Sequence, residues 1–297
     1  MLTYLELLAA SARQSGNCAC MGLDPQLEGL PYHTGDIRSD LGRFFGELLG
    51  AIHNKGWSPA AFKPNLGYYS ALDKPRDGYF GGSLALVDLL ALLDHKFPGI
   101  PVILDAKRGD IARSSKNYAI EAFDNWKTDA ITISPYMGAD SVEPFLQLAG
   151  GRKGAYVLDR TSNNGAKDLQ NLTVVDEMDG ETRYPLFRAV AMRIARWAEA
   201  QPGIGAVVGA TSPDELSEIA TYFAPQRIPL LIPGVGSQGA SAQATLELLR
   251  NSAYPVQLAR INSSSAITHP WKTQPVPSDW LDRSLANLSG FLKETAL

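Results

Sequence analysis

The stretch Val102-Ile103-Leu104-Asp105-Ala106-Lys107-Arg108-Gly109-Asp110 points to the fold of the whole chain. It opens with apolar, partly β-branched residues, which are typical of a strand buried on both faces. It then becomes charged, reaches a glycine, and is followed by a helix-like run over 112–126. The segment therefore predicts a strand, a polar loop and a helix in that order, with the charged residues at the carboxyl end of the strand.

The same order of strand and helix recurs along the chain. Strand-like runs occupy 18–23, 59–63, 102–105, 130–134, 155–159, 206–209, 229–232 and 256–261. The helix-like runs that follow them occupy 40–54, 83–96, 112–126, 141–149, 185–200, 214–223, 240–250 and 280–293. Eight such units in 297 residues predict an α/β fold, a (β/α)8 TIM barrel. A doubly wound open sheet is the alternative, but no G-x-G-x-x-G follows the first strand.

Because no linker divides the sequence, we expect one barrel domain over residues 1–297. An N-terminal extension at 1–17 and a C-terminal helix at about 278–295 account for the length beyond a typical barrel.

Composition excludes several function classes. The 27 basic and 31 acidic residues give a net charge of −4 without a basic block, so neither nucleic acid nor a membrane surface is an expected partner. The longest apolar stretch, 84–93, is too short for a membrane span, and no signal peptide is visible, so we expect a cytoplasmic protein. Four scattered histidines and two cysteines make a Cys/His metal site hard to build. Cys18 and Cys20 fit better as small buried residues.

The active site of such a barrel lies at the carboxyl ends of the strands. Asp105 and Lys107 are two residues apart, so they face the same side of an extended strand. Lys63 ends the neighbouring strand and Asp110 follows a glycine, which predicts a Lys–Asp–Lys–Asp group whose alternating charges favour their ionised forms. An ion-pair network that merely closes the rim is the alternative, but desolvated charges are a costly way to do so. The other polar residues at these strand ends are Asp24, Ser134, Ser162, Gln238 and Ser263, Ser264 and Ser265.

The loops after the seventh and eighth strands are candidates for phosphate binding, as in many barrels of this type. They read Pro233-Gly234-Val235-Gly236-Ser237-Gln238-Gly239 and Asn262-Ser263-Ser264-Ser265. Glycines such as Gly234 and Gly236 let backbone N–H groups approach an anion, while the hydroxyls and the Gln238 amide add donors. A flexible polar loop without a ligand is the alternative.

These residues together resemble the orotidine 5′-phosphate decarboxylase family. The segment 105–111 matches its D-x-K-x-x-D signature, and the likeness spans about residues 18 to 268. The forms F-K-P-N and R-T-S-N resemble the longer bacterial branch of the family. The further matching pieces are Leu23-Asp24-Pro25, Phe62-Lys63-Pro64-Asn65, Arg160-Thr161-Ser162-Asn163 and 233–239.

The resemblance implies a lyase that converts orotidine 5′-monophosphate to UMP and CO2 in pyrimidine biosynthesis, without metal or organic cofactor. It implies that Lys107 protonates C6 of the pyrimidine and that Asp105 lies against the departing carboxylate. Lys63 and Asp24 would orient the ribose end and the charge network. Ser162 would hydrogen-bond the pyrimidine edge, and Gln238 would contact the phosphate from a closing loop.

Partners are implied as well. The family resemblance implies a homodimer in which Asp110 reaches into the partner's site, with Ser114 nearby. Some relatives are fused to an orotate phosphoribosyltransferase, so a fusion or an association with that enzyme is a further expectation.

One departure from the family pattern concerns the phosphate. Relatives usually carry an arginine after the eighth strand, where this chain has Ser265. We expect a cradle of backbone N–H groups and hydroxyls from Ser264 and Ser265, with a basic residue such as Arg260 or Lys272 reaching in.

Two other functions remain open at this point. A Mg²⁺-dependent sugar-phosphate synthase or decarboxylase of the same suprafamily shares D-x-K-x-x-D, although F-K-P-N and R-T-S-N favour the pyrimidine enzyme. A catalytically inactive nucleotide-binding barrel is the second, against which the intact set of two lysines and two aspartates argues.

Overall fold

The computed structural model describes residues 2–176, 178–236, 239–272 and 274–297. Its centre is a sheet of eight parallel strands in the order β2-β1-β10-β9-β8-β5-β4-β3. The end strands β2 and β3 are joined by the parallel bridges Phe62–Val102 and Asn65–Asp105, which close the sheet into a barrel. The predicted (β/α)8 barrel is confirmed. The strands are β1 (Ala19–Gly22), β2 (Ala61–Lys63), β3 (Ile103–Arg108), β4 (Ala130–Ile133), β5 (Gly154–Arg160), β8 (Ile204–Val208), β9 (Leu230–Ile232) and β10 (Ala259–Ser263).

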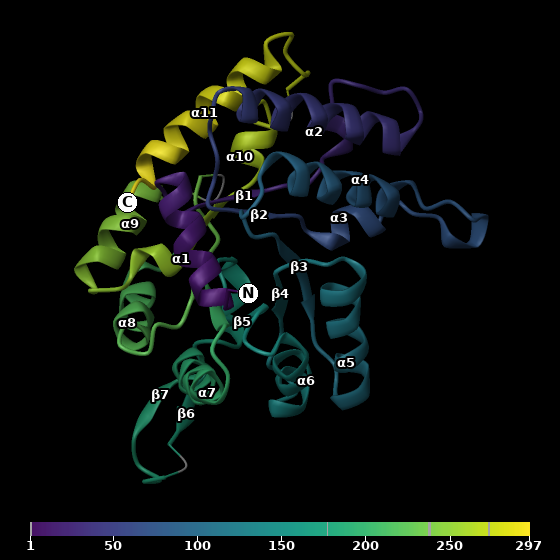
Figure 1. Cartoon of the computed structure of the whole chain (residues 1–297). Coiled ribbons are helices and arrows are strands. Elements are labelled where there is room, and N and C mark those ends of the chain that lie inside the picture. The colour runs from purple at the N-terminus through teal and green to yellow at the C-terminus, as the bar shows by residue number, and fades with distance from the viewer. Residues whose placement is uncertain (1, 177, 237–238, 273) are drawn as a thin grey trace.

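Helices surround the strands, with at least one after each (Figure 1). Two helices follow β2, and the first of them is the short α3 (Leu66–Ser70). Every predicted helical run falls on one of them, although α5 ends at Ile120 and the turn after it, Glu121–Asn125, is π-helical. The run 256–261 was predicted as strand throughout, but it begins with a 3-10 turn, Val256–Leu258. The surrounding helices are α2 (Ile37–Asn54), α4 (Gly81–Lys96), α5 (Ala112–Ile120), α6 (Ala139–Ala149), α7 (Leu186–Ala200), α8 (Pro213–Phe223), α9 (Ala242–Asn251) and α11 (Trp280–Glu294).

The N-terminal extension forms a helix, α1 (Tyr4–Ser15), which begins with a capping box between Thr3 and Glu6. Tyr4 is fully buried, and its hydroxyl lies 3.1 Å from that of Tyr156 on β5. Arg260, at the start of β10, donates 2.7 Å hydrogen bonds to the Leu8 carbonyl and the Ser11 hydroxyl. Helix α1 therefore covers the amino end of the barrel.

This placement corrects one prediction. Arg260 is fully buried at the amino end of β10, whereas a phosphate bound by the seventh and eighth loops would lie beyond the carboxyl end. Its guanidinium also donates to the carbonyls of Gln257 and Ala259. Arg260 thus fixes α1 to the barrel and does not reach the phosphate loops.

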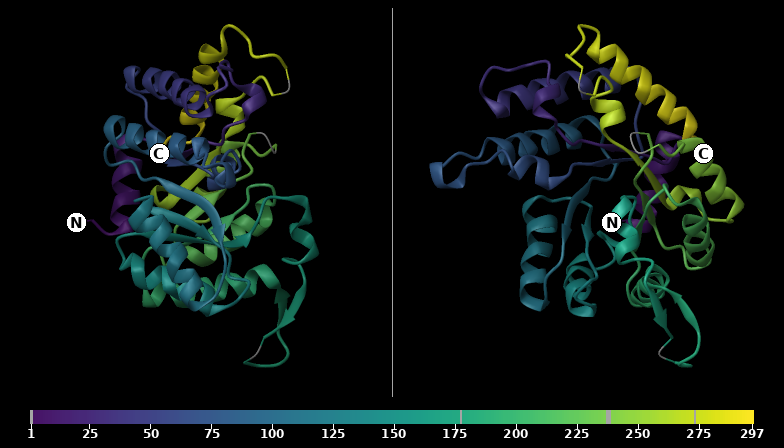
Figure 2. Two further views of the ribbon diagram at one scale, coloured as in Figure 1. Left: turned by 90° about the vertical axis from the view of Figure 1, so that its right-hand side faces the viewer. Right: turned by 180° about the vertical axis from the view of Figure 1, so that it is seen from behind.

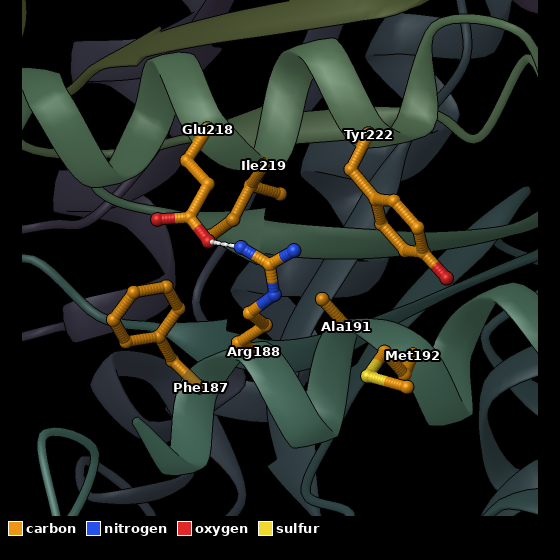
Figure 3. A pocket seen from close by; sticks show the side chains of 7 residues that line it. All are labelled: Phe187, Arg188, Ala191, Met192, Glu218, Ile219 and Tyr222. Atoms are coloured by element: carbon orange, nitrogen blue, oxygen red, sulfur yellow. Dashed lines mark hydrogen bonds and ion pairs between the residues drawn. The ribbon is translucent and has the colours of Figure 1, made fainter. Parts of the chain in front are cut away.

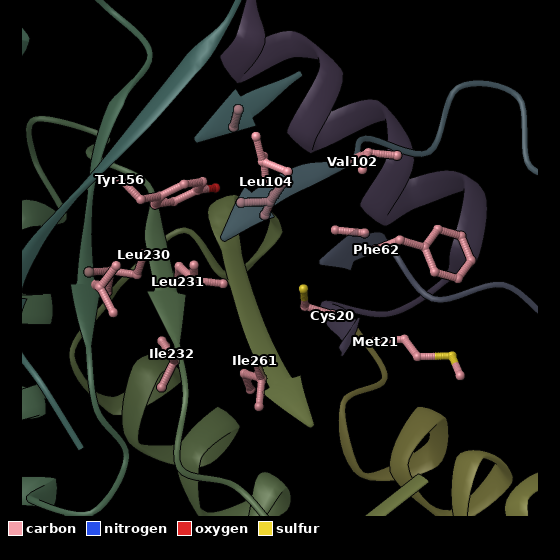
Figure 4. Close-up of a cluster of buried hydrophobic side chains, with 14 of the residues drawn as sticks. Cys20, Met21, Phe62, Val102, Leu104, Tyr156, Leu230, Leu231, Ile232 and Ile261 are labelled. Carbon is pink, nitrogen blue, oxygen red and sulfur yellow. The ribbon is translucent and has the colours of Figure 1, made fainter. Parts of the chain in front are cut away.

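Apolar side chains from most of the strands fill the core, and Figure 4 shows Cys20, Leu104, Tyr156 and Ile261 among them. Both cysteines are free and buried, as predicted. Burial raises the pKa of the Cys18 thiol to about 11 and that of Cys20 to about 12, so both remain protonated thiols at neutral pH.

A hairpin that the sequence analysis did not predict lies between β5 and α7. Its strands β6 (Thr173–Val175) and β7 (Arg183–Pro185) pair antiparallel and stand away from the barrel (Figures 1 and 2). Both strands are short and partly exposed, so they lack the apolar pattern that marks a buried strand.

The C-terminal end of the chain pairs with the segment that follows α1. Asn17 and Ala296 form an antiparallel bridge, and the Cys18 N–H donates to the Thr295 carbonyl at 3.0 Å. Helix α11 was predicted at about 278–295 and spans Trp280–Glu294. No helix in the described part of the chain is both long and apolar enough to cross a membrane.

His269 lies in the cap that α2 and α11 form with the segment after α10 (Ser265–Thr268). Its ring is 5.2 Å from that of Phe44 and 5.6 Å from that of Trp271, measured between centroids. The imidazole Nδ1 lies 2.9 Å from the Thr268 hydroxyl. Burial lowers the pKa of His269 from 6.5 to about 4, so the folded protein holds this ring neutral.

This shift predicts how stability depends on pH. Between pH 6.5 and 4 the unfolded chain binds a proton at His269 that the folded protein does not, so stability falls as the pH drops. The full loss is about 3 kcal/mol. Urea denaturation at several pH values should therefore give a flatter profile for His269→Phe than for the wild type.

The matched control is His53→Phe, because His53 is exposed on α2 and packs edge-on against Phe97. This variant should keep the wild-type slope. An unchanged slope in His269→Phe would contradict the prediction.

Candidate active site

Asp105 on β3 lies between two lysines at the carboxyl end of the barrel. Its Oδ2 is 2.8 Å from Nζ of Lys63, and its Oδ1 is 2.5 Å from Nζ of Lys107. Lys63 and Asp105 are buried, whereas the Lys107 side chain is 49% exposed and faces the mouth. Of these three groups, only the Lys107 ammonium is thus open to a ligand that enters from solvent.

The charges of this cluster stabilise one another. Burial disfavours the charged form of Lys63, but Asp24 and Asp105 outweigh it and hold the pKa above its ordinary 10.5. Burial likewise opposes ionisation of Asp105, but Lys63 and Lys107 hold its pKa well below the ordinary 3.8. The carboxylate therefore stays anionic and Lys63 cationic across the physiological range.

Lys107 reaches Asp105 by a different route from the one predicted. An extended strand was predicted here, but the backbone of Lys107 is left-handed, with φ 46°. The β3–β4 pairing shifts register between Leu104 and Arg108. A bulge of this kind re-aims a side chain, and here it directs the lysine amine back onto Asp105.

Asp24 follows β1 and connects the cluster to the eighth loop, which is the loop after β10, the eighth strand of the barrel in chain order. Its Oδ1 accepts the Asn65 N–H at 3.1 Å, and its Oδ2 accepts the Ser264 hydroxyl at 2.6 Å. Gly22 permits this approach, because a Cβ there would lie 2.5 Å from Cβ of Ser264. The Ser264 hydroxyl thus orients Asp24 in this structure.

The other predicted binding residues follow their strands at the same end of the barrel. Ser162 follows β5, and its carbonyl accepts the Thr211 hydroxyl at 3.0 Å. Gly234 and Gly236 follow β9 with φ of 99° and 82°, a backbone that favours glycine. The Gly236 N–H is engaged by the Ala240 carbonyl at 3.0 Å. Ser265 begins the short helix α10 after β10, and Gln238 lies outside the described residues.

Asp110 does not join the other three charged groups within the chain. Its Oδ1 accepts the N–H of Ile111 at 2.7 Å, and the ion pairs found among the described residues do not include it. Ser114 lies in the first turn of α5, half-buried, four residues further on. The structure therefore brings together Lys63, Asp105 and Lys107, and leaves Asp110 directed elsewhere.

Two groups at the site were missed in the sequence. Thr132 on β4 is buried and hydrogen-bonds Asp105, but in the sequence it reads as one more β-branched strand residue. Arg160 of the R-T-S-N segment is buried and pairs with Glu215 of α8, Nε to Oε2 at 2.5 Å. The arginine thus anchors the fifth loop, which follows β5, to helix α8. The spacing of the R-T-S-N motif does not indicate Glu215 as the partner of Arg160.

A separate hollow lies between α7 and α8, on the outer wall of the barrel (Figure 3). Phe187, Ala191 and Ile219 line it, and an ion pair joins Arg188 to Glu218 across it. This lining lacks the convergent charged groups of the barrel mouth. In the described part of the chain, no three His, Cys, Asp or Glu residues are grouped to hold a metal ion.

A closed (β/α)8 barrel with a buried charge cluster at the carboxyl ends of its strands has the architecture of an enzyme. Residues 20–253 match the family described as Orotidine 5′-phosphate decarboxylase / HUMPS. The chain belongs to this family.

Individual proteins named for this family are also similar to the chain. The chain is 37% identical over 268 residues to the orotidine 5′-phosphate decarboxylase of Janthinobacterium sp. (strain Marseille), covering 90% of each. It is 38% identical over 272 residues to that of Azoarcus sp. (strain BH72), covering 91% of each.

Solved structures show the same fold. The OMP decarboxylase of Leishmania donovani aligns with a TM-score of 0.72 and 28% identity over 99% of both chains. The UMP synthase of the same organism aligns with a TM-score of 0.73 and 30% identity, over 98% of this chain and 56% of that one.

The cluster makes a prediction about stability. Asp105→Asn leaves Lys63 a buried cation without its carboxylate, so the free energy of unfolding should fall by about 3 kcal/mol in urea denaturation. The matched control is Asp88→Asn, which breaks an ion pair with Arg38 that is largely exposed. That loss should be below about 1 kcal/mol. Equal effects in the two variants would show that the buried pair has no special weight.

Proposed function

We propose that the protein is an orotidine 5′-phosphate decarboxylase, converting orotidine 5′-monophosphate to UMP and CO2 without a metal or organic cofactor. The observation that carries the proposal is the Lys63–Asp105–Lys107 cluster at the barrel mouth of a member of this family. The relatives named for this reaction align over nine-tenths of the chain, which supports it.

In the proposed mechanism Lys107 protonates C6 of the pyrimidine. Loss of CO2 leaves a carbanion at C6, and a fixed ammonium beside that carbon stabilises the developing charge and then supplies a proton. Asp105 holds the Lys107 amine at 2.5 Å, so little reorganisation is required during the reaction. Asp105 would also lie against the departing carboxylate, while Lys63 keeps the aspartate anionic.

Binding of the rest of the substrate falls to the other strand ends. We assign the ribose to Asp24 and Lys63, the pyrimidine edge to Ser162, and the phosphate to the loops that carry Gly234, Gly236, Gln238, Ser264 and Ser265. Lys272 is exposed just after α10, so it is the candidate for the nearby cation once Arg260 is excluded. A UMP-bound structure without phosphate contacts from 234–239 or 262–265 would contradict this assignment.

We further propose a homodimer in which Asp110 completes the partner's site. Asp110 is half-buried and unpaired with the lysines of its own chain, and exposed apolar side chains lie on its loop and on the next loop at the same end of the barrel. The exposed large apolar residues on the β3–α5 and β4–α6 loops are Ile111, Tyr136 and Met137. Ser114, one turn into α5, would lie at the same interface.

The remaining proposals concern context. We propose a cytoplasmic location for the enzyme. We also propose that residues 1–297 form a single barrel domain, and the packing of α1 and α11 on the barrel supports this. Association with an orotate phosphoribosyltransferase is a further proposal, supported by the alignment with a UMP synthase.

Of the alternatives, the Mg²⁺-dependent sugar-phosphate enzyme needs a carboxylate free to bind the metal. Both oxygens of Asp105 are within hydrogen-bonding distance of a lysine amine, and two cations there repel a third. In a catalytically inactive barrel, apolar residues would serve stability as well as a buried charge cluster, whose desolvation is costly.

Loss of orotidine 5′-monophosphate, followed by its UV absorbance, tests the function. The wild type should turn the substrate over equally with and without EDTA, and Lys107→Ala should lower kcat by at least about 10³-fold because the proton donor is lost. Lys293→Ala, an exposed lysine on α11, is the control and should match the wild type. Unchanged kcat in Lys107→Ala would refute the mechanism, and loss of this turnover with EDTA would contradict a reaction without metal. Absence of orotidine 5′-monophosphate turnover in the wild type would leave the sugar-phosphate reaction as the alternative.

The shared site can be tested by mixing two inactive variants. In a heterodimer of Asp110→Ala and Lys107→Ala, one site has both an intact Lys107 and an intact Asp110 from the partner. Random exchange of subunits should then restore about a quarter of wild-type activity, because half of the dimers are mixed and each has one intact site. Absence of recovery, once heterodimers are shown by mass spectrometry, would show that Asp110 acts within its own chain.

A further inference from the structure

Thr132 lies opposite the bulge that carries the charge cluster. In the β3–β4 pairing Leu104 aligns with Ile131 and Arg108 with Ile133, so three residues of β3 face Thr132 alone. We propose that Thr132 is a positioning residue of the active site, whose hydroxyl fixes both the Lys107 backbone and the Asp105 carboxylate in their reactive arrangement. The proposal rests on the proposed function of Lys107.

The hydroxyl of Thr132 uses its full hydrogen-bonding capacity. Its Oγ1 accepts the N–H of Ala106 at 3.1 Å and that of Lys107 at 3.0 Å, and it donates to Oδ1 of Asp105 at 2.9 Å. A threonine hydroxyl has one proton and two lone pairs. Since both lone pairs receive amide protons, its own proton is directed to Asp105, and the group has a single orientation.

These hydrogen bonds to Thr132 replace the strand-to-strand hydrogen bonds that the bulge interrupts. The N–H groups of Ala106 and Lys107 lie where the strand ladder is interrupted, and Thr132, itself 1% exposed, supplies their acceptor. The left-handed backbone of Lys107 is unfavourable for a residue with a Cβ. The amide bond to Thr132 is therefore placed where the backbone needs an external restraint.

The same oxygen of Asp105 receives both the Thr132 hydroxyl and the Lys107 amine. Thr132 thereby fixes the direction from which the ammonium approaches the carboxylate, and with it the position of the amine at the mouth. Displacing a reacting group by about 1 Å is enough to slow an enzyme by on the order of 100-fold.

Three variants of the full chain separate positioning from mere stability. Thr132→Val keeps the shape but removes the hydroxyl, and Thr132→Ser keeps the hydroxyl. Thr128→Val is the control, because Thr128 is equally buried just before β4 and its hydroxyl donates to the Ala122 carbonyl, away from the cluster. Thermal melting accompanies each assay and checks that the variants are folded.

In the orotidine 5′-monophosphate assay, Thr132→Val should lower kcat by on the order of 10- to 100-fold with KM little changed. Thr132→Ser should recover most of the loss, and Thr128→Val should retain wild-type kcat. Wild-type kcat in Thr132→Val, or equal losses in Thr132→Val and Thr128→Val, would overturn the proposal.

A readout independent of turnover distinguishes this proposal from the proposed function. Labelling of the Lys107 amine by trinitrobenzenesulfonate, followed by mass spectrometry, should be at least about three-fold faster in Thr132→Val than in Thr128→Val as the amine is released from Asp105. If the wild type fails to turn over the substrate but labelling changes as expected, only the proposed function fails. Identical labelling in all variants would refute the positioning role of Thr132.

Discussion

The carboxylate of Asp105, buried between two ammonium groups, is the interaction on which the rest of the site depends. A buried anion is tolerated only when cations and donors surround it, and here Lys63, Lys107 and Thr132 supply them. The bridge between Asn65 and Asp105 places the same residue at the seam where β2 meets β3. The contact that closes the barrel therefore also places Asp105 in the charge cluster.

The amino and carboxyl ends of the barrel have different roles, and single strands contribute residues to both ends. Arg260, the second residue of β10, fixes α1 over the amino end, and the chain after this strand supplies Ser264 at the mouth. β5 begins beneath Tyr4 and ends in Arg160, which anchors the fifth loop to α8. Helix α1 thus closes the amino end, whereas the charge cluster and the left-handed Lys107 lie at the open end.

Much of the fold and of the charged group could be predicted from the sequence, because both depend on local patterns. Alternation of buried strand runs and amphipathic helices is visible in the sequence, and polar residues at strand ends must meet on one rim. The left-handed backbone of Lys107 and the contacts of Thr132 could not be predicted, since they arise from a register shift between two strands. Arg260 was assigned to the wrong end of the barrel for a similar reason: its partners lie about 250 residues away on α1.

Position 265 is a serine in this chain, and under the proposed function this serine bears on how the phosphate-binding loop relates to the charge cluster. Ser264, next to that position, donates to Asp24, and Asp24 in turn favours the cationic form of Lys63. A hydrogen bond therefore joins Ser264 to Asp24, with Gly22 making room for it, and Asp24 acts on Lys63, the partner of Asp105, through its charge. An anion bound at Ser264 competes with Asp24 for the same hydroxyl proton, because a serine has only one. In the proposed function, phosphate binding would thus be linked through the Ser264 proton and Asp24 to Lys63, which keeps Asp105 ionised.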